Sequence, residues 1–189
     1  MRVSAAYRRN APKMWRDCAT KLATLYAAAP SLKPPFPKGV YSACTINFPP
    51  NTACRYHVDH ANRAGGWCSV YAGGTYNPDE GGHLVLPQLK IFIRFPPGST
   101  ILLPSATLLH GNTFVPSSQS RWSFVQYCAG GLFRFVEYGL TTMRRMKRED
   151  PVKAIAFEQA AAERWHIELG LLSRIDSLHQ DRVACGLVR

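Results

Sequence analysis

The sequence predicts a mainly β domain with helices at both ends. Residues 39–139 are punctuated by Gly and Pro and rich in β-branched and aromatic residues, the composition of many short strands. Apolar residues recur at three- and four-residue steps over 11–29, and Asp150-Pro151 is a helix-start signal. Short strands without helices between them are typical of a sandwich, a barrel or a jelly roll.

The N-terminal flank, about residues 1–35, contains the first expected helix. The spacing predicts an amphipathic helix over 11–29 with an apolar face of Met14, Cys18, Leu22, Leu25, Tyr26 and Ala29. Pro30 ends it, and the proline-rich run 33–37 is expected to be an extended linker.

The central region, residues 39–139, is expected to form the β core. Alternating and β-branched runs predict short strands at 41–48, 67–71, 84–86, 91–95, 100–103 and 122–128. Turns are expected at Pro96-Pro97-Gly98 and at Pro116-Ser117-Ser118.

The C-terminal flank, residues 150–189, opens with the Asp150-Pro151 signal and continues as a helix-forming run over 152–172. Both flanks are expected to brace the sheet. A length of 189 residues with 46% hydrophobic content suits a single domain spanning 1–189. Because a helix begins so near Met1, we also expect that upstream sequence is missing.

The charge is strongly unbalanced. There are 23 Lys and Arg against 12 Asp and Glu, a net charge of +11. Residues 1–58 contain nine basic residues and one acid, Asp17, and a second basic cluster spans 144–148. Such a field favours nucleic acid as a partner, with an acidic membrane surface second. The alternative is a basic surface that binds no partner.

The cysteines and the apolar runs bear on the compartment. The six cysteines are scattered without a Cys-x-x-Cys pair, so a zinc ribbon is not indicated. No run approaches the length of a membrane span or a signal peptide. We therefore expect an intracellular protein with reduced thiols and no membrane partner.

Three side chains form a candidate metal site. His57 and Asp59 are two residues apart, so on a strand or at its end they project from one face. His110 follows the strand expected at 100–103. Two histidines and one carboxylate form the facial triad suited to non-haem Fe(II), which leaves open positions for a co-substrate and O2. A hydrolytic zinc with the same ligands is the competing interpretation.

Arg121 favours the iron interpretation. On the strand expected there, Arg121, Ser123, Val125 and Tyr127 share one face, an unusual composition for a core. The face makes sense as the lining of a pocket in which Arg121 binds one carboxylate of 2-oxoglutarate bidentately and Ser123 adds a hydrogen bond. The other end of this co-substrate would chelate the iron.

Short motifs occur through the central region, over about 36–139. They are His57-Val58-Asp59-His60-Ala61-Asn62, Gly66-Trp67-Cys68, Gly81-Gly82-His83-Leu84-Val85-Leu86, Phe95-Pro96-Pro97-Gly98-Ser99-Thr100, Pro104-Ser105-Ala106, His110-Gly111-Asn112, and Arg121-x-Ser123 leading into Gly130-Gly131-Leu132-Phe133-Arg134. In these motifs the region resembles the Tet/base-J-binding-protein branch of 2-oxoglutarate/Fe(II) dioxygenases, and within it a fungal transposon-associated group.

The resemblance implies a double-stranded β-helix core of the jelly-roll or cupin type. It implies oxidation of a methyl group on a flipped-out base, the chemistry of DNA demethylation, with release of succinate and CO2. In that scheme His57, Asp59 and His110 bind iron, and Arg121 and Ser123 bind 2-oxoglutarate. These residues are the expected catalytic and co-substrate set.

The resemblance also points to substrate contacts at Asn62 and Tyr127. Asn62 matches the position that contacts the methylated base, although it is equally well a turn residue in Asn-Arg-Ala-Gly-Gly. Tyr127 matches the aromatic residue that stacks on the base. The branch usually has a histidine where this chain has Ala129, a departure that concerns the base and not the iron. His60 and His83 are expected to have no metal role.

Three functions stay open at this point. The first is hydroxylation of a methyl group on a nucleic-acid base, with 5-methylcytosine in DNA favoured, which would place the protein in the nucleus. The second is the same chemistry on a protein side chain or a small molecule. The third is a non-catalytic nucleic-acid-binding domain. We expect a monomer.

Overall fold

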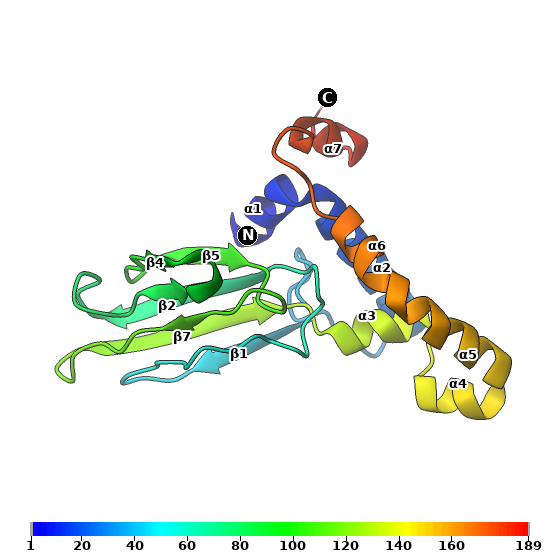
Figure 1. The fold of residues 1–189 in the computed structure, drawn as a ribbon, viewed down its shortest axis with the longest axis horizontal. Coiled ribbons are helices and arrows are strands. Elements are labelled where there is room, and N and C mark those ends of the chain that lie inside the picture. The colour runs from blue at the N-terminus through cyan, green and yellow to red at the C-terminus, as the bar shows by residue number, and fades with distance from the viewer. Residues whose placement is uncertain (1, 189) are drawn as a thin grey trace. The chain divides into compact units, whose positions relative to one another are not determined.

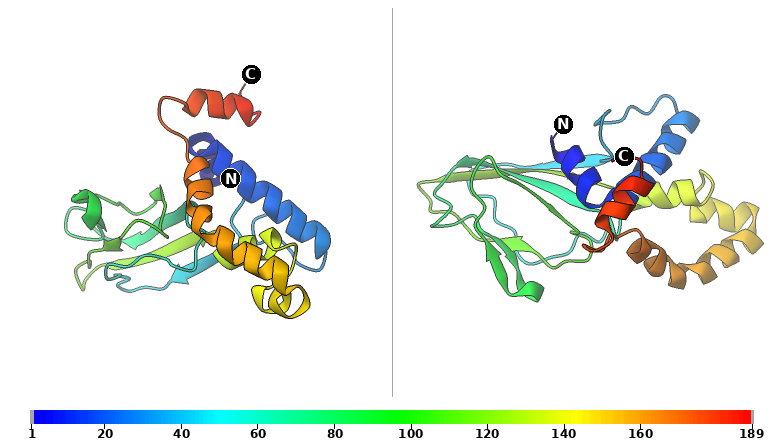
Figure 2. Two further views of the ribbon diagram at one scale, coloured as in Figure 1. Left: turned by 45° about the vertical axis from the view of Figure 1, so that its right-hand side comes forward. Right: turned by 90° about the horizontal axis from the view of Figure 1, so that it is seen from above.

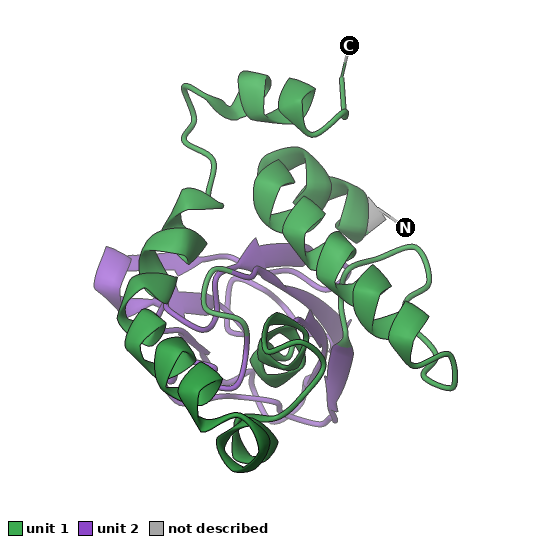
Figure 3. Ribbon diagram, turned by 90° about the vertical axis from the view of Figure 1, so that its right-hand side faces the viewer, with its two compact units in different colours: residues 1–42, 63–65, 129–189 green, residues 43–62, 66–128 purple. Residues whose placement is uncertain are grey.

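The structure is a computed structural model that describes residues 2–188; Met1, Arg189 and the side chain of Arg2 lie outside the described parts. The elements are shown in Figure 1. The chain divides into two compact units, which Figure 3 distinguishes by colour. A helical unit comprises residues 1–42, 63–65 and 129–189, and a β unit comprises residues 43–62 and 66–128.

The β unit contains two antiparallel sheets. The four-stranded sheet has the order β1-β7-β2-β5 and the three-stranded sheet has the order β4-β3-β6. The strands are β1 (Ala43–Asn47), β2 (Cys68–Thr75), β3 (Leu84–Leu86), β4 (Ile91–Ile93), β5 (Thr100–Leu103), β6 (Gly111–Asn112) and β7 (Ser120–Tyr127). A short 3-10 helix, η1 (Pro87–Leu89), lies between β3 and β4.

One apolar core joins the two sheets. Cys68, Ala72 and Leu103 contribute to it from the four-stranded sheet, and Leu84 and Leu86 contribute from the three-stranded sheet. All five are at most 5% exposed. Two antiparallel sheets packed over a common core, with helices flanking them in the sequence, confirm the predicted mainly β, jelly-roll class.

Strand β7 is the central element that positions the site. It pairs with β1 on one side and with β2 on the other. Its residues alternate between two faces, so Arg121, Ser123, Val125 and Tyr127 share one face. On the opposite face Trp122 lies against Gly73 of β2, where a Cβ atom would come within 2.2 Å of the indole. This close approach requires glycine at position 73.

The helical unit is built from short helices, seen from two further directions in Figure 2. They are α1 (Arg2–Asn10), α2 (Pro12–Ala28), α3 (Gly130–Glu137), α4 (Met143–Glu149), α5 (Pro151–Gln159), α6 (Arg164–Gly170) and α7 (Leu178–Ala184), with a 3-10 segment η2 (Ala160–Glu163). Within residues 2–188 no helix has the length and apolar character needed to cross a membrane.

The predicted helices are partly corrected. The helix over 11–29 is present as α2, and Asp150 caps α5 by accepting a hydrogen bond from the Lys153 N–H at 3.0 Å. The single helix predicted over 152–172 is wrong, because η2 tightens the backbone between α5 and α6. The sequence Ala160-Ala161-Ala162 contains no helix breaker, so nothing local predicted this interruption.

Arg63 organises the helical unit. Its side chain is 3% exposed and forms ion pairs with Asp17 of α2 at 2.7 Å and with Glu168 of α6 at 2.8 Å. The guanidinium also lies 5.0 Å from the ring centroid of Phe133 in α3. One cation therefore connects three helices that are distant in sequence, and it follows directly after Asn62 in the chain.

Candidate metal and co-substrate site

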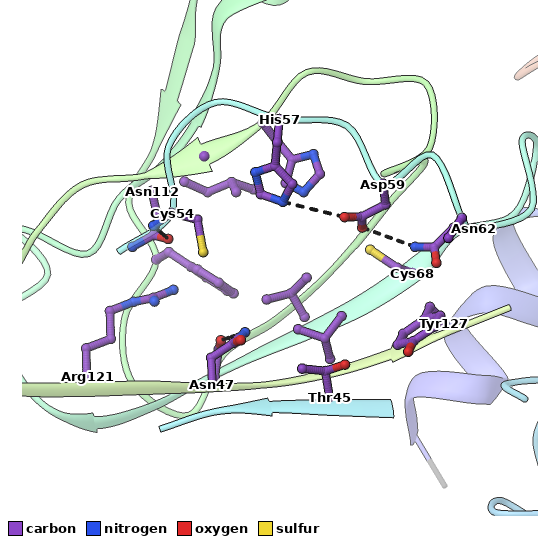
Figure 4. A pocket seen from close by; sticks show the side chains of 18 residues that line it. Thr45, Asn47, Cys54, His57, Asp59, Asn62, Cys68, Asn112, Arg121 and Tyr127 are labelled. Carbon is purple, nitrogen blue, oxygen red and sulfur yellow. Dashed lines mark hydrogen bonds and ion pairs between the residues drawn. The ribbon is translucent and has the colours of Figure 1, made fainter. Parts of the chain in front are cut away.

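The β unit encloses a cavity of about 340 Å³, shown in Figure 4. This volume falls within the range of small-molecule sites. The predicted residues of the metal, co-substrate and substrate groups all line it, together with others that the sequence did not suggest. They are His57, Asp59, His110, Arg121, Ser123, Asn62 and Tyr127, with Thr45, Asn47, Cys54, Cys68 and Asn112 among the additional polar and thiol residues.

The backbone brings the three candidate metal ligands together. His57 and His110 face each other in an antiparallel bridge, with reciprocal N–H to O distances of 3.0 Å. Asp59 follows two residues later, and its N–H donates to the Ser105 carbonyl at 2.8 Å. The ligand atoms of His57, Asp59 and His110 lie within 4.8 Å of one another. Small rotamer changes can place them around one ion at distances of about 2.0–2.2 Å.

Hydrogen bonds orient both imidazoles for metal binding. Nδ1 of His57 lies 2.7 Å from the Arg55 carbonyl, and Nδ1 of His110 lies 2.9 Å from the Leu108 carbonyl. A carbonyl only accepts, so each Nδ1 donates to it, and Nε2 is the ring nitrogen left to bind a metal. Such outer contacts are typical of metal-binding histidines. The donor set of this site therefore fits a divalent metal.

Asn62 supports the carboxylate of Asp59. Its Nδ2 donates to Asp59 Oδ2 and to Ser105 Oγ, both at 3.1 Å. These two contacts use both hydrogens of the amide, and they leave its carbonyl oxygen as a free acceptor. Asn62 is thus more than a turn residue, since it holds the Asp59 carboxylate through Oδ2, whereas Oδ1 lies 3.5 Å from His57 Nε2.

Arg121 is a buried cation without a carboxylate partner. It is 2% exposed, and no ion pair among the described residues includes it. Its Nη1 donates to the Thr52 carbonyl at 2.8 Å, whereas its Nε is buried with no hydrogen-bond partner. A buried guanidinium is costly unless an anion compensates it. The residue therefore fits a site for a carboxylate ligand.

Ser123 and Asn47 form a polar pair beside Arg121. They are directly opposite each other in the β1–β7 register, and Asn47 Nδ2 donates to Ser123 Oγ at 2.9 Å. Because Ser123 accepts this hydrogen bond, its own hydroxyl hydrogen is available to a ligand. Asn47 was not predicted; it would have required knowledge of the strand pairing, which no local sequence pattern provides.

The pocket thiols are suited to packing and not to nucleophilic attack. Burial raises the pKa of Cys68 to about 11, and burial is also the main cause of the raised pKa of Cys54. Both are therefore neutral thiols near pH 7, and a thiolate is the form that attacks a substrate. The pocket chemistry belongs to its imidazoles, its carboxylate and its guanidinium.

The cavity has two chemically different ends. Arg121 and Tyr127 lie on the same face of β7 but six residues apart, which corresponds to about 20 Å along a strand. Figure 4 shows Arg121 and Asn47 at one end, Asn62 and Tyr127 at the other, and His57 and Asp59 between them. His57 and Asp59 thus lie between an end with the Arg121 guanidinium and an end with an amide and a phenol.

The remaining predicted positions lie outside this cavity. His60 is exposed, and His83 contacts the Thr113 hydroxyl at 3.2 Å through Nδ1; neither lines the pocket. Ala129 belongs to the helical unit, where it precedes the first residue of α3.

No protein-family model and no curated protein matches the sequence. Among solved structures, the chain is similar to NgTET1 in complex with 5mC DNA, with 17% identity over 48% of this chain and 35% of that chain and a TM-score of 0.42. It is also similar to the viral collagen prolyl hydroxylase vCPH from Paramecium Bursaria Chlorella virus-1 in its 2OG complex, with 13% identity, 58% and 70% coverage and a TM-score of 0.33. The chain thus spans about a third of the length of the first. Both structural similarities are distant.

Proposed function

We propose that this chain is an Fe(II)- and 2-oxoglutarate-dependent dioxygenase that hydroxylates a methyl group on a nucleic-acid base, with 5-methylcytosine in DNA as the favoured substrate. The observation that carries the proposal is the presence, in one cavity, of a two-histidine, one-carboxylate triad and a buried, uncompensated Arg121. A dicarboxylate co-substrate would supply the anion that compensates this cation, whereas hydrolysis by zinc needs no anionic co-substrate.

In this proposal His57, Asp59 and His110 bind the iron, and the Nδ1–H contacts of both histidines fix their ring orientation. Arg121 binds the distal carboxylate of 2-oxoglutarate, and Ser123, held by Asn47, donates its hydroxyl hydrogen to it. Bound iron with 2-oxoglutarate and O2 supplies the oxidation, in which one oxygen atom enters succinate and the other the methyl group while CO2 is released. The chain's own contribution is to bind, orient and separate the reactants.

The free oxygen of Asn62 bears on the choice of base. Because both amide hydrogens are committed to Asp59 and Ser105, Asn62 can only accept a hydrogen bond from a substrate. Cytosine presents an exocyclic amine, a donor, whereas thymine presents a carbonyl at the equivalent position. Because Asn62 can act only as a hydrogen-bond acceptor, it favours 5-methylcytosine over thymine. The ring of Tyr127 offers a surface on which a flipped base can stack.

The test is nucleoside mass spectrometry after incubation of the purified chain with Fe(II), 2-oxoglutarate and ascorbate. Duplexes that contain 5-methylcytosine should yield hydroxymethylcytosine, and unmethylated duplexes should yield no oxidised thymine. Chelation should abolish the product, and Fe(II) but not Zn(II) should restore it. Product formed with Zn(II), or without 2-oxoglutarate, would exclude the proposed chemistry. Succinate formation that is stimulated by peptides and not by DNA would move the substrate to a protein side chain.

A further inference from the structure

A second cavity lies in the helical unit, between α1 and α7. Its volume is about 580 Å³, and its lining combines three guanidinium groups and one imidazole with three apolar side chains. The lining residues are Ala5, Arg8, Arg9, His179, Arg182, Leu187 and Val188. We call this cavity the α1–α7 cleft.

Contacts from α1 and from the neighbouring α2 reach α7 across a sequence distance of more than 160 residues: one from Arg9 of α1, and two from Lys13 and Arg16 of α2. Arg182 Nε donates to the Arg9 carbonyl at 2.7 Å, and Arg16 Nη1 donates to the Ala184 carbonyl at 2.9 Å. Lys13 forms an ion pair with Asp181 at 3.3 Å. These contacts hold α7 against α1 and α2, and Asp181 of α7 is already paired with Lys13, a residue outside the lining.

The cations of the cleft have free donors and no acidic partner. No described ion pair includes Arg8, Arg9 or Arg182. Arg8 lies over the ring of Trp15, with 5.5 Å between its Cζ and the ring centroid, a geometry that leaves the N–H edge of the guanidinium open. Arg182 uses only its Nε, so its two terminal nitrogens are available as a fork.

The other basic cluster, residues 144–148, is different. Arg145 and Arg148 both pair with Glu149, at 2.7 and 2.9 Å, and Lys147 pairs with Glu158 at 2.5 Å. These acids neutralise much of the local field. The sequence suggested two basic clusters for polyanion binding, residues 1–58 and residues 144–148. The first gains Arg182 from α7, whereas the positive charge of the second is largely neutralised by Glu149 and Glu158.

We propose that the α1–α7 cleft binds a backbone phosphate of nucleic acid, with Arg8, Arg9 and Arg182 as its ligands. The inference rests on the proposed function, which supplies the nucleic acid, and it adds a contact site remote in sequence from the candidate catalytic residues. Guanidinium groups bind phosphate oxygens through paired N–H donors. Three of them gathered without an acid repel one another, so an anion in the cleft is stabilised by all three. Leu187 and Val188 line the same cleft and offer no competing acceptor side chain.

The test compares two double variants that remove the same charge from the helical unit. Arg8→Gln with Arg182→Gln changes the cleft, and Arg145→Gln with Arg148→Gln is the matched control. Fluorescence anisotropy measures binding to an unmethylated duplex over a series of salt concentrations, without iron or 2-oxoglutarate. Each lost phosphate contact should reduce the slope of log affinity against log salt by about 0.9. Because the cleft is proposed to bind one phosphate, we expect a reduction of about 0.9 for the cleft variant and little change for the control.

Several results would overturn the cleft as the phosphate site. Equal reductions in the two double variants would show that net charge alone sets the affinity. An unchanged slope in the cleft variant would remove these residues from the interface. If Arg182→Gln lowers the melting temperature, the salt dependence of Arg8→Gln alone still tests the cleft. Arg8 makes no hydrogen bond to α7 among the described contacts, so its replacement should leave the fold intact. Absence of wild-type binding at low salt would refute both proposals, whereas DNA binding without base oxidation would refute the proposed function and leave the cleft standing.

Discussion

Among individual residues, Arg121 gives the sharpest prediction, which concerns the dependence on 2-oxoglutarate. Its guanidinium is almost fully buried, and its Nε finds no partner in the described chain. Arg121→Met should raise the 2-oxoglutarate concentration needed for half-maximal succinate formation by about 30–150-fold, since a charge-assisted pair contributes about 2–3 kcal/mol. Iron affinity should be nearly unchanged. Arg94→Met, which removes an exposed arginine paired with Asp79, is the matched control. An unaltered co-substrate dependence in Arg121→Met would exclude this residue from the pocket function.

Replacement of Tyr127 and replacement of Asn62 should affect base oxidation and uncoupled 2-oxoglutarate turnover differently. Tyr127→Ala should reduce base oxidation more than uncoupled turnover of 2-oxoglutarate, because Tyr127 lies at the end of the pocket remote from Arg121. Asn62→Ala should reduce base oxidation and also affect turnover to some extent, because Asn62 bonds directly to Asp59. The ratio of oxidised base to succinate measures the difference. Equal loss of both activities in Tyr127→Ala would instead indicate a role in the fold.

The residues that the sequence could predict are those whose chemistry is unusual for their local pattern. A His-x-Asp pair, a later histidine and an arginine on an apolar strand stand out without any knowledge of the fold. Asn47, Ser105 and the free oxygen of Asn62 could not be found in this way, because their roles depend on pairing between distant segments. The assigned metal, co-substrate and substrate roles remain predictions.

Among the helices and strands, Arg63 makes the strongest prediction. Its removal leaves Asp17 and Glu168 without their buried cation. Arg63→Ala should lower the free energy of unfolding by about 3 kcal/mol, the lower end for a broken buried pair, because both acids keep some solvent contact. Arg94→Ala is the control: its ion pair with Asp79 is 55% and 65% exposed, so its removal should leave the free energy of unfolding nearly unchanged. Denaturant unfolding measures both, and similar values for the two variants would contradict the account of Arg63.

The strands were easier to predict than the helices for a physical reason. Each predicted strand is bounded by Gly, Pro or polar turn residues and carries β-branched or aromatic side chains, so its signal is local. β6 has two residues and exists only through its pairing with β3. α1 and α7 are short and partly charged, and contacts such as Arg182 to the Arg9 carbonyl hold them together.

For the chain as a whole, charge and chemistry are divided between the two compact units. The candidate metal ligands, Arg121 and Tyr127 all belong to the β unit, whereas the cationic α1–α7 cleft belongs to the helical unit. The affinity for any duplex should therefore fall as the salt concentration rises. Methylated and unmethylated duplexes should bind similarly and should differ mainly in the rate of turnover. The net charge of +11 favours a polyanionic partner, which stays a prediction, and it could not indicate which arginines lack an acidic partner and which are paired.

The most direct test of the central claim follows both oxygen atoms of O2. The chain is incubated with Fe(II), 2-oxoglutarate and a 5-methylcytosine duplex under isotopically labelled ¹⁸O2, and both products are analysed by mass spectrometry. We predict succinate and hydroxymethylcytosine in equal amounts, with one labelled oxygen incorporated into each when exchange with water is controlled. Asp59→Ala should form neither product. Unlabelled succinate, or a hydroxylated base formed without any succinate, would contradict the assignment of His57, Asp59, His110 and Arg121 to a 2-oxoglutarate-dependent dioxygenase.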